Sequence, residues 1–278
     1  MSIQPLMVHK ARLVTTIALF ASLVVLSGCD RASEPTPAGM EGVRPSETVE
    51  SDGPPLSLVP GDPRLKVGKK LLMAGRFDEA LVIFDTVARA RPDLARASFL
   101  KGMAFHGKKS HAQALEHYLE AEGLRQEFAE RELLDYYIAW SAFYSGDSEL
   151  SKARVEQCLL DNPERADPNF LAGLLAFNDD RLDAAERSLR RALEYALLEP
   201  EPVRSKELRR GWLRLSDVLA RSERREEALE AIDNAISVRP DFAESWFRKA
   251  SILSRLGREA EAEAALDRWK ALGGGRGS

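Results

Sequence analysis

Few side chains in this sequence could act as nucleophiles or bind a metal. The chain of 278 residues has two cysteines, Cys29 and Cys158, and four histidines. None of the histidines is paired with cysteines or carboxylates at a spacing known for metal sites. Three of them are His106, His111 and His117, but the last two are six residues apart and miss one helical face. The sequence therefore predicts neither a metal site nor a cofactor.

Catalytic motifs built from other residue types are also missing. The sequence holds no glycine-rich phosphate loop, no serine in a nucleophile elbow and no acid pair placed for hydrolysis. The net charge of −4 is too small to indicate nucleic acid as a partner. These features predict a protein that binds other proteins and is not an enzyme. A pocket with convergent carboxylates or histidines would favour the enzymatic alternative.

The surroundings of Cys29 favour a different chemistry, the attachment of lipid. Residues 13–25 carry no charge and follow Lys10 and Arg12. This length is typical of the apolar part of a signal peptide and is too short to span a bilayer comfortably. The next four residues, Leu-Ser-Gly-Cys at 26–29, resemble the bacterial lipobox. In that motif a peptidase cuts before the cysteine, whose thiol carries a diacylglycerol group.

The lipobox resemblance implies that residues 1–28 are a cleaved signal peptide and that Cys29 is acylated, for example with palmitate. Two or three acyl chains suffice for stable membrane binding. The protein would then be anchored on the extracytoplasmic side of a membrane, which is the periplasm in a Gram-negative cell. Asp30 resembles an inner-membrane retention signal of enteric bacteria, but inner and outer membrane both stay open. The alternative is an ordinary cysteine after an uncleaved membrane anchor.

A linker is predicted between the lipid anchor and the folded part, over residues 29–60. From residue 30 on it is rich in Pro, Ser, Glu and Gly, and its few apolar residues show no helical period. Such a segment cannot bury enough apolar surface to offset the entropy lost on ordering. A flexible chain of this length has a reach of roughly 30 Å. Residues 56–60, by contrast, are apolar enough to pack on the first folded unit.

From residue 61 onward the chain repeats itself. A small residue recurs at intervals of 34, 37, 34, 43 and 34 residues. Small residues also stand twelve positions before it, and bulky apolar or aromatic residues stand four positions after it. The recurring column is Ala80, Ala114, Ser151, Ala185, Ala228 and Ala262; the earlier column is Gly68, Gly102, Ala139, Gly173, Ser216 and Ala250; the later column is Phe84, Tyr118, Val155, Leu189, Ile232 and Leu266.

These columns resemble the tetratricopeptide repeat, which has a period of 34. Trp212 and Trp246 fill the first aromatic position of that family, and Pro92, Pro163 and Pro240 fill its terminal proline position. The resemblance covers residues 61–272 of a domain that we expect to span 61–278. It implies an all-α, right-handed superhelical solenoid of about six helical hairpins. The repeats are expected near 61–94, 95–131, 132–165, 166–208, 209–242 and 243–272.

The residue types in the columns have mechanical explanations. A bulky residue in the glycine column would hold paired helices apart, and the large residue four positions after the alanine is expected to fill the space between neighbouring repeats. Cys158 stands in a small-residue column, which indicates a buried thiol. Gly75, Gly146 and Gly257 are expected in the turns between paired helices, where left-handed backbone suits glycine.

Two repeats are longer than the family period. Three extra residues in the second repeat are expected to extend its second helix around residues 120–128. Nine extra residues fall near 198–205, where two prolines predict a loop and a break between two sub-arrays of repeats. The charged run from 221 to 227 is expected to be a solvated turn and helix start.

The resemblance also implies a concave groove lined by the first helix of each repeat. The fifth position of each repeat should point into it, together with the positions four and seven further on. These positions make the middle of the groove aromatic and apolar and its C-terminal end polar. They are Leu65, Phe99, Tyr136, Phe170, Leu213 and Phe247; then Lys69, Met103, Trp140, Leu174, Asp217 and Ser251; then Leu72, His106, Phe143, Phe177, Ala220 and Ser254.

The predicted function is a membrane-tethered adaptor or assembly scaffold of the bacterial cell envelope that holds a segment of a protein partner in this groove. Aromatic residues and Met are favoured at protein interfaces. One alternative is that the rings are packed core or cover the linker. A second is a structural subunit of an envelope complex that binds through its convex face and its ends. The predicted partner-binding residues are Phe99, Met103, Tyr136, Trp140, Phe143, Tyr144, Phe170 and Phe177.

Overall fold

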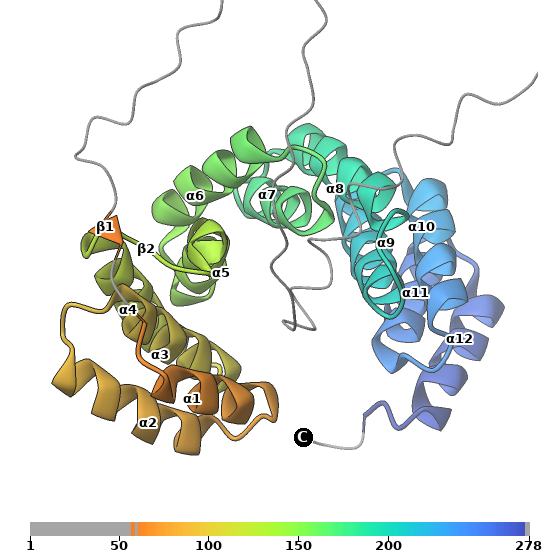
Figure 1. The fold of residues 1–278 in the computed structure, drawn as a ribbon. Helices are drawn as coiled ribbons and strands as arrows, with labels where there is room; N and C mark the ends of the chain where they lie inside the picture. The colour runs from red at the N-terminus through yellow and green to blue at the C-terminus, as the bar shows by residue number, and fades with distance from the viewer. Residues whose placement is uncertain (1–56, 59–60, 276–278) are drawn as a thin grey trace, which may run out of the picture.

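The computed structural model describes residues 57–58 and 61–275, so the predicted signal peptide, Cys29 and the linker to residue 56 lie outside its described part. Within that part twelve α-helices follow one another and pair as hairpins (Figure 1), which confirms the all-α repeat fold. No helix of the described residues is long and apolar enough to cross a membrane. The helices are α1 Arg64–Met73, α2 Phe77–Ala90, α3 Ala95–Gly107, α4 His111–Gly123, α5 Leu134–Ser145, α6 Ser148–Asp161, α7 Ala166–Asn178, α8 Leu182–Ala196, α9 Val203–Arg221, α10 Arg225–Val238, α11 Ala243–Arg255 and α12 Glu259–Ala271.

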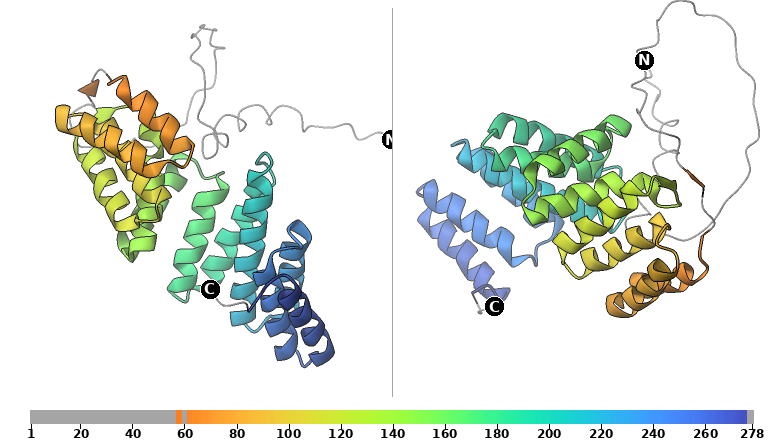
Figure 2. Two further views of the ribbon diagram at one scale, coloured as in Figure 1. Left: turned by 90° about the horizontal axis from the view of Figure 1, so that it is seen from below. Right: turned by 90° about the vertical axis from the view of Figure 1, so that its left-hand side faces the viewer.

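The six hairpins stack side by side along an arc. Helices α5, α7 and α9 lie on the inner side of the arc, and α6, α8 and α10 lie on its outer side (Figure 1). The views in Figure 2 show the first hairpins and the last hairpins at opposite ends of the molecule. We call the inner side, formed by the odd-numbered helices, the concave surface.

The small and large columns pack against one another within each repeat. A methyl group added at Gly102 would lie 2.6 Å from ring carbons of Tyr118, and one added at Gly173 would lie 2.7 Å from Leu189 Cγ. Tyr118 and Leu189 are fully buried. The large residue therefore fills the space above the small residue of its own repeat, and not only the space between neighbouring repeats that we expected.

The turn between paired helices uses left-handed backbone in every hairpin. Gly75, Gly146 and Gly257 have φ of 73°, 85° and 74°, as predicted. The other three hairpins place non-glycine residues at φ near +60° in the same turn, where the next helix starts within three residues. These residues are Lys109, Asp180 and Glu223.

The three extra residues of the second repeat form an irregular connection, so the predicted extension of its second helix is wrong. Helix α4 ends at Gly123, and Arg125 has left-handed backbone with φ of 48°. A two-residue strand, β2 Gln126–Glu127, comes next and pairs in parallel with β1 Ser57–Leu58. The buried Gln126 side chain fixes this connection, because its Oε1 accepts a hydrogen bond of 3.0 Å from the Ala95 amide. The segment expected to pack on the first repeat is thus paired with the end of the second.

The nine extra residues of the fourth repeat mostly lengthen a helix. Helix α9 begins at Val203, six residues before the boundary predicted at 209, and runs for 19 residues. The predicted loop is present, because residues 197–202, which include both prolines, connect α8 to α9 without helix. The predicted break between sub-arrays is wrong, because α8 and α9 pack against each other. The hydrophobic core instead divides within α5: one cluster of buried residues runs from Leu65 to Ile138 and the other from Ala139 to Ala265.

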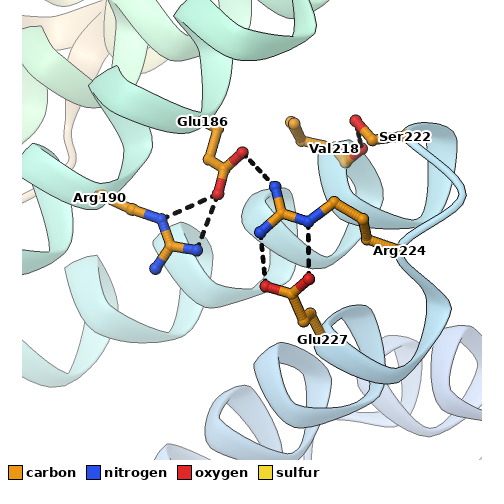
Figure 3. A network of polar contacts seen from close by, with 6 residues as sticks. All are labelled: Glu186, Arg190, Val218, Ser222, Arg224 and Glu227. Atoms are coloured by element: carbon orange, nitrogen blue, oxygen red, sulfur yellow. Dashed lines mark hydrogen bonds and ion pairs between the residues drawn. The ribbon is translucent and has the colours of Figure 1, made fainter.

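Ion pairs join the outer helices of neighbouring repeats. The Arg224 guanidinium donates to Glu227 beside it and, across the repeat boundary, to Glu186 Oε2 at 2.6 Å (Figure 3). Arg190 donates to the same Glu186 carboxylate at 2.8 Å. The charged run at 221–227 forms the predicted turn and helix start, and its Arg224 also links α8 to the start of α10.

Candidate functional site

The structure brings most of the predicted aromatic residues together on the concave surface. Helix α5 carries Tyr136, Trp140, Phe143 and Tyr144, and Trp140 stands three or four residues from each of the others, which places them on one side of the helix. The Trp140 ring centre lies 5.9 Å from that of Phe143, 5.5 Å from that of Tyr144 and 6.3 Å from that of Phe170 on α7. Predicted residues from two neighbouring repeats therefore form one cluster of rings.

Several of these rings are buried, so a partner could not contact them. Phe99 is 0% exposed, and Trp140 and Phe170 are each 6% exposed. Phe99 packs against three rings in its own and the next repeat. Tyr144, by contrast, is 55% exposed. The half-buried members are Met103, Tyr136, Phe143 and Phe177.

An arginine from the next repeat covers the buried rings. The Arg210 guanidinium on α9 lies 4.1 Å from the Phe170 ring centre and 5.7 Å from that of Trp140. It forms an ion pair with Asp167, whose Oδ2 accepts a hydrogen bond of 2.6 Å from Trp140 Nε1. Burial lowers the pKa of Arg210 to about 10, which leaves the guanidinium charged at neutral pH.

Sequence reasoning missed this cover because Arg210 stands in no repeat column. Helices α3, α7 and α11 each begin 19 residues before their small column, whereas α9 begins 25 residues before Ala228. The extra turns carry Glu207, which is 7% exposed and pairs with Arg210. The unusual interval of 43 residues was the available signal that this region departs from a plain repeat.

Two histidines lie next to the aromatic cluster: His106, which was predicted to line the groove, and His111, for which no role was predicted. His111 stacks on Tyr144 with ring centres 4.3 Å apart, and the His106 ring centre is 5.0 Å from that of His111. Burial lowers the pKa of His106 to about 4, so this ring is neutral at physiological pH. Within residues 61–275 no third histidine, cysteine or carboxylate joins them as a possible metal ligand.

Further along the concave surface, Phe177 opens into a cavity of about 370 Å³ between α7, α9 and α11. Its lining includes Asp217, Ala220 and Ser251, which were predicted to lie at the polar end of the groove. Arginines supply the walls. Arg221 lies over the Phe177 ring at 5.2 Å and pairs with Asp180 at its rim.

The charges in this cavity are mostly but not fully paired. Asp217 is held by two guanidinium groups, those of Arg214 and Arg248. Arg255, the third arginine in the wall, is exposed and has no ion pair among the described residues. The cavity is therefore a partly apolar depression in which Arg255 has no described ion-pair partner, and the Phe177 ring forms part of its lining.

The outer surface has a smaller apolar cleft of about 310 Å³ between α6 and α7, lined by Val155, Leu159 and Leu175 among others. Leu160 at its edge is 72% exposed. Cys158 lies nearby on α6 and is 6% exposed, and burial raises the pKa of its thiol to about 11. The thiol is therefore protonated at neutral pH, in line with the predicted buried cysteine.

Comparison with known proteins finds the repeat in the chain itself. A family model described as the tetratricopeptide repeat matches residues 68–127, 136–200 and 213–276. No match was found among curated proteins.

Among solved structures, the chain resembles the anaphase-promoting complex hetero-tetramer Cut9–Hcn1 with a TM-score of 0.63 and 18% identity over 75% of this chain, which spans 39% of that one. It resembles YrrB, described as having an unusual peptide-binding site, with a TM-score of 0.52 and 20% identity over 66% of this chain and 88% of that one. A repeat protein from Cytophaga hutchinsonii, represented by its C-terminal part, gives a TM-score of 0.54 and 10% identity over 75% and 78%. At these identities the likeness concerns the fold alone.

Proposed function

The chain belongs to the tetratricopeptide repeat family, and from this premise we propose that it is a scaffold that holds a segment of a partner protein on its concave surface. Proteins of this family are interaction scaffolds and adaptors, and their stacked hairpins present an extended concave surface. The proposed role is therefore binding, with no chemical step on the partner.

One observation carries this proposal: neighbouring inner helices present an exposed ring, Tyr144 on α5, and a cavity lined by Phe177 and three arginines between α7, α9 and α11. Tyr144 is 55% exposed and touches the half-buried Phe143. Phe177 lies on the neighbouring inner helix and forms part of the cavity wall. Tyrosine and arginine are enriched among residues that dominate binding energy. The surface from Tyr144 to Arg255 thus offers rings for apolar side chains and a cation for an acidic one.

The buried half of the aromatic cluster has a supporting role in this proposal. Trp140 and Phe170 are held under Arg210 and fix the positions of α5 and α7 relative to α9. We therefore reduce the proposed contact residues to Met103, Tyr136, Phe143, Tyr144 and Phe177, and add Arg221 and Arg255.

We further propose that the scaffold is tethered to the bacterial cell envelope through an acylated Cys29, with protein partners in the same compartment. The lipobox-like residues 26–29 and the uncharged run before them support this part of the proposal. Residues 30–60 would let the repeat domain stand off the membrane by roughly 30 Å. A partner segment reaching the concave surface could then belong to a membrane protein or to a soluble one.

A second candidate, a structural subunit that binds through its outer face and its ends, is supported by one observation. Leu160 is 72% exposed beside the apolar cleft between α6 and α7. Large exposed apolar residues next to a cleft mark interaction sites in many proteins.

Photo-crosslinking in intact cells separates the two candidates. A photoreactive amino acid is placed at position 144 on the concave surface or at position 160 on the outer face. We expect a specific protein adduct from position 144 that is lost when Phe177→Ala is added. Adducts from position 160 alone, with none from position 144, would favour the structural subunit.

A further inference from the structure

The last hairpin presents a pocket that no described residue fills. A cavity of about 460 Å³ lies between α11 and α12, and Phe247, Ser251, Glu263 and Leu266 help to line it. Phe247 is 49% exposed there. The pocket is therefore partly apolar and carries a carboxylate.

The repeat register shows what belongs in this pocket. One period of 34 residues earlier, the equivalents of Phe247, Glu263 and Leu266 are Leu213, Leu229 and Ile232. Those three side chains are 5%, 8% and 0% exposed, because α11 packs on the α9–α10 hairpin. The pocket on α11 and α12 is thus the place that a following inner helix would take.

The charges repeat in the same register. Asp85 and Asp233, each five residues after the small column, form ion pairs of 2.9 and 2.7 Å with a lysine on the next inner helix, Lys101 and Lys249. The equivalent residue on α12 is Asp267. Its described ion pair is only with Lys270 of its own helix, and both side chains are largely exposed. In the last hairpin, Asp267 therefore stands at the position whose equivalents form an ion pair with a lysine of the next repeat.

Helix α1 at the other end of the molecule has the complementary face. Its Val67 and Leu71 occupy the columns of Lys249 and Leu253, through which α11 packs on α10. Val67 is 55% exposed. Lys66 and Lys70 flank it on the same helical face, and neither makes an ion pair within the described part of the chain. This end is apolar and basic where the other end is apolar and acidic.

We propose that α1 of a second copy docks in the pocket between α11 and α12, so that copies of this chain associate head to tail. Val67 and Leu71 take the places of Lys249 and Leu253 against the last hairpin, and the neighbouring Lys66 and Lys70 supply the cations for Glu263 and Asp267 of the other copy. The contact joins two different surfaces, so it continues the superhelix from one copy into the next and produces open chains or closed rings. This contact leaves the part of the concave surface around Tyr144 and Phe177 free for a partner.

Charge reversal on the purified full chain tests this contact by sedimentation velocity in detergent over a range of concentrations. One variant carries Glu263→Lys with Asp267→Lys, and the other carries Lys66→Glu with Lys70→Glu. Each alone should weaken self-association by about tenfold or more, and high salt should weaken the wild-type contact. An equimolar mixture of the two variants should associate again through the swapped charges. Glu194→Lys, an exposed reversal on α8, is the matched control and should associate like wild type.

Two outcomes would overturn the proposal. One is a wild-type chain that stays monomeric at every concentration, because the pocket is then empty or filled by the chain's own remaining residues. The other is self-association that both reversals leave unchanged, because another surface then mediates it. Photo-crosslinking from position 144 in the same variants separates this inference from the proposed function, since neither α5 nor the cavity between α7, α9 and α11 carries any of these substitutions.

Discussion

The guanidinium of Arg210 lies 4.1 Å from the centre of the Phe170 ring, and the same group pairs with Asp167, which accepts a hydrogen bond from Trp140. Three consecutive inner helices, α5, α7 and α9, are therefore joined by one buried set of polar and aromatic contacts. This set closes part of the surface that the repeat pattern alone leaves open. It moves the accessible part of the groove toward Tyr144 and Phe177.

Replacement of Arg210 should be strongly destabilising. Arg210→Ala takes the closer of two cations from the nearly buried carboxylate of Glu207, leaving Lys206 at 3.9 Å. It also removes the ion pair of Asp167 and uncovers Phe170. Removing one member of a buried ion pair costs about 3–5 kcal/mol. Arg214→Ala, one turn further along α9, removes a 40% exposed member of an ion pair and should cost about 0–1 kcal/mol. Urea unfolding followed by circular dichroism measures the free energy of unfolding of both variants. If the two substitutions lower it by equally small amounts, Arg210 does not stabilise the buried rings.

The glycine column should tolerate no larger side chain. In Gly173→Leu the first added carbon alone would come within 2.7 Å of Leu189 and 3.4 Å of the Ala185 carbonyl oxygen. Overpacking of this kind costs typically about 1–3 kcal/mol. Gly123→Ala at the end of α4 is the control, because an added methyl there meets no atom within 4 Å. A thermal melt of Gly173→Leu that matches wild type would show that α7 and α8 can separate without cost.

Stability should fall as the pH is lowered from about 6.5 toward 4. The ordinary histidine pKa is near 6.5, and burial lowers that of His106 to about 4. The unfolded chain therefore binds a proton in this window that the folded chain does not, and the free energy of unfolding decreases by up to about 3 kcal/mol. Urea unfolding at several pH values measures this slope. His106→Gln should flatten it, and an unchanged slope in this variant would assign the pH dependence to other groups.

Lipid attachment is expected at Cys29. Cys29→Ser removes the thiol that would carry the diacylglycerol group, so normal signal cleavage and acylation should both stop. Metabolic labelling with radioactive palmitate, followed by gel electrophoresis, reports acylation. Labelling that persists in Cys29→Ser would rule out this cysteine as the attachment site. Cys158→Ser is the control and should keep its label, because that thiol is buried in the repeat domain.

The fold could be predicted from the sequence because the repeat is a local pattern. The small column, the large column four residues later and the glycine turns act within one hairpin, so their spacing along the chain determines their contacts in space. The Gly102–Tyr118 contact is an example, since both residues belong to one repeat. The same residue types recur at the same positions in all six repeats. Few folds other than a stack of helical hairpins fit such a pattern.

The site could be predicted only in part because its exposure depends on contacts between repeats. Nothing in the sequence near Trp140 shows that Arg210, 70 positions away, would cover it. The same reason explains why two parts of the interpretation of the insertions were wrong, namely the longer second helix of the second repeat and the break near residues 198–205. The Gln126 side chain anchors its connection through the Ala95 amide, so this contact depends on the position of α3. The extra residues of α9 form a helix because they pack against α8.

The most direct test of the proposed concave binding surface is the affinity of the segment captured from position 144 for three purified variants. We predict that Tyr144→Ala binds roughly 5- to 30-fold more weakly, as expected for an interface anchor, and melts like wild type. Leu160→Ser on the outer face should bind normally, and Trp140→Ala should lose about 3–5 kcal/mol of stability, as a core residue does. Normal binding by Tyr144→Ala together with lost binding by Leu160→Ser would contradict the proposed concave site and place the partner on the outer face.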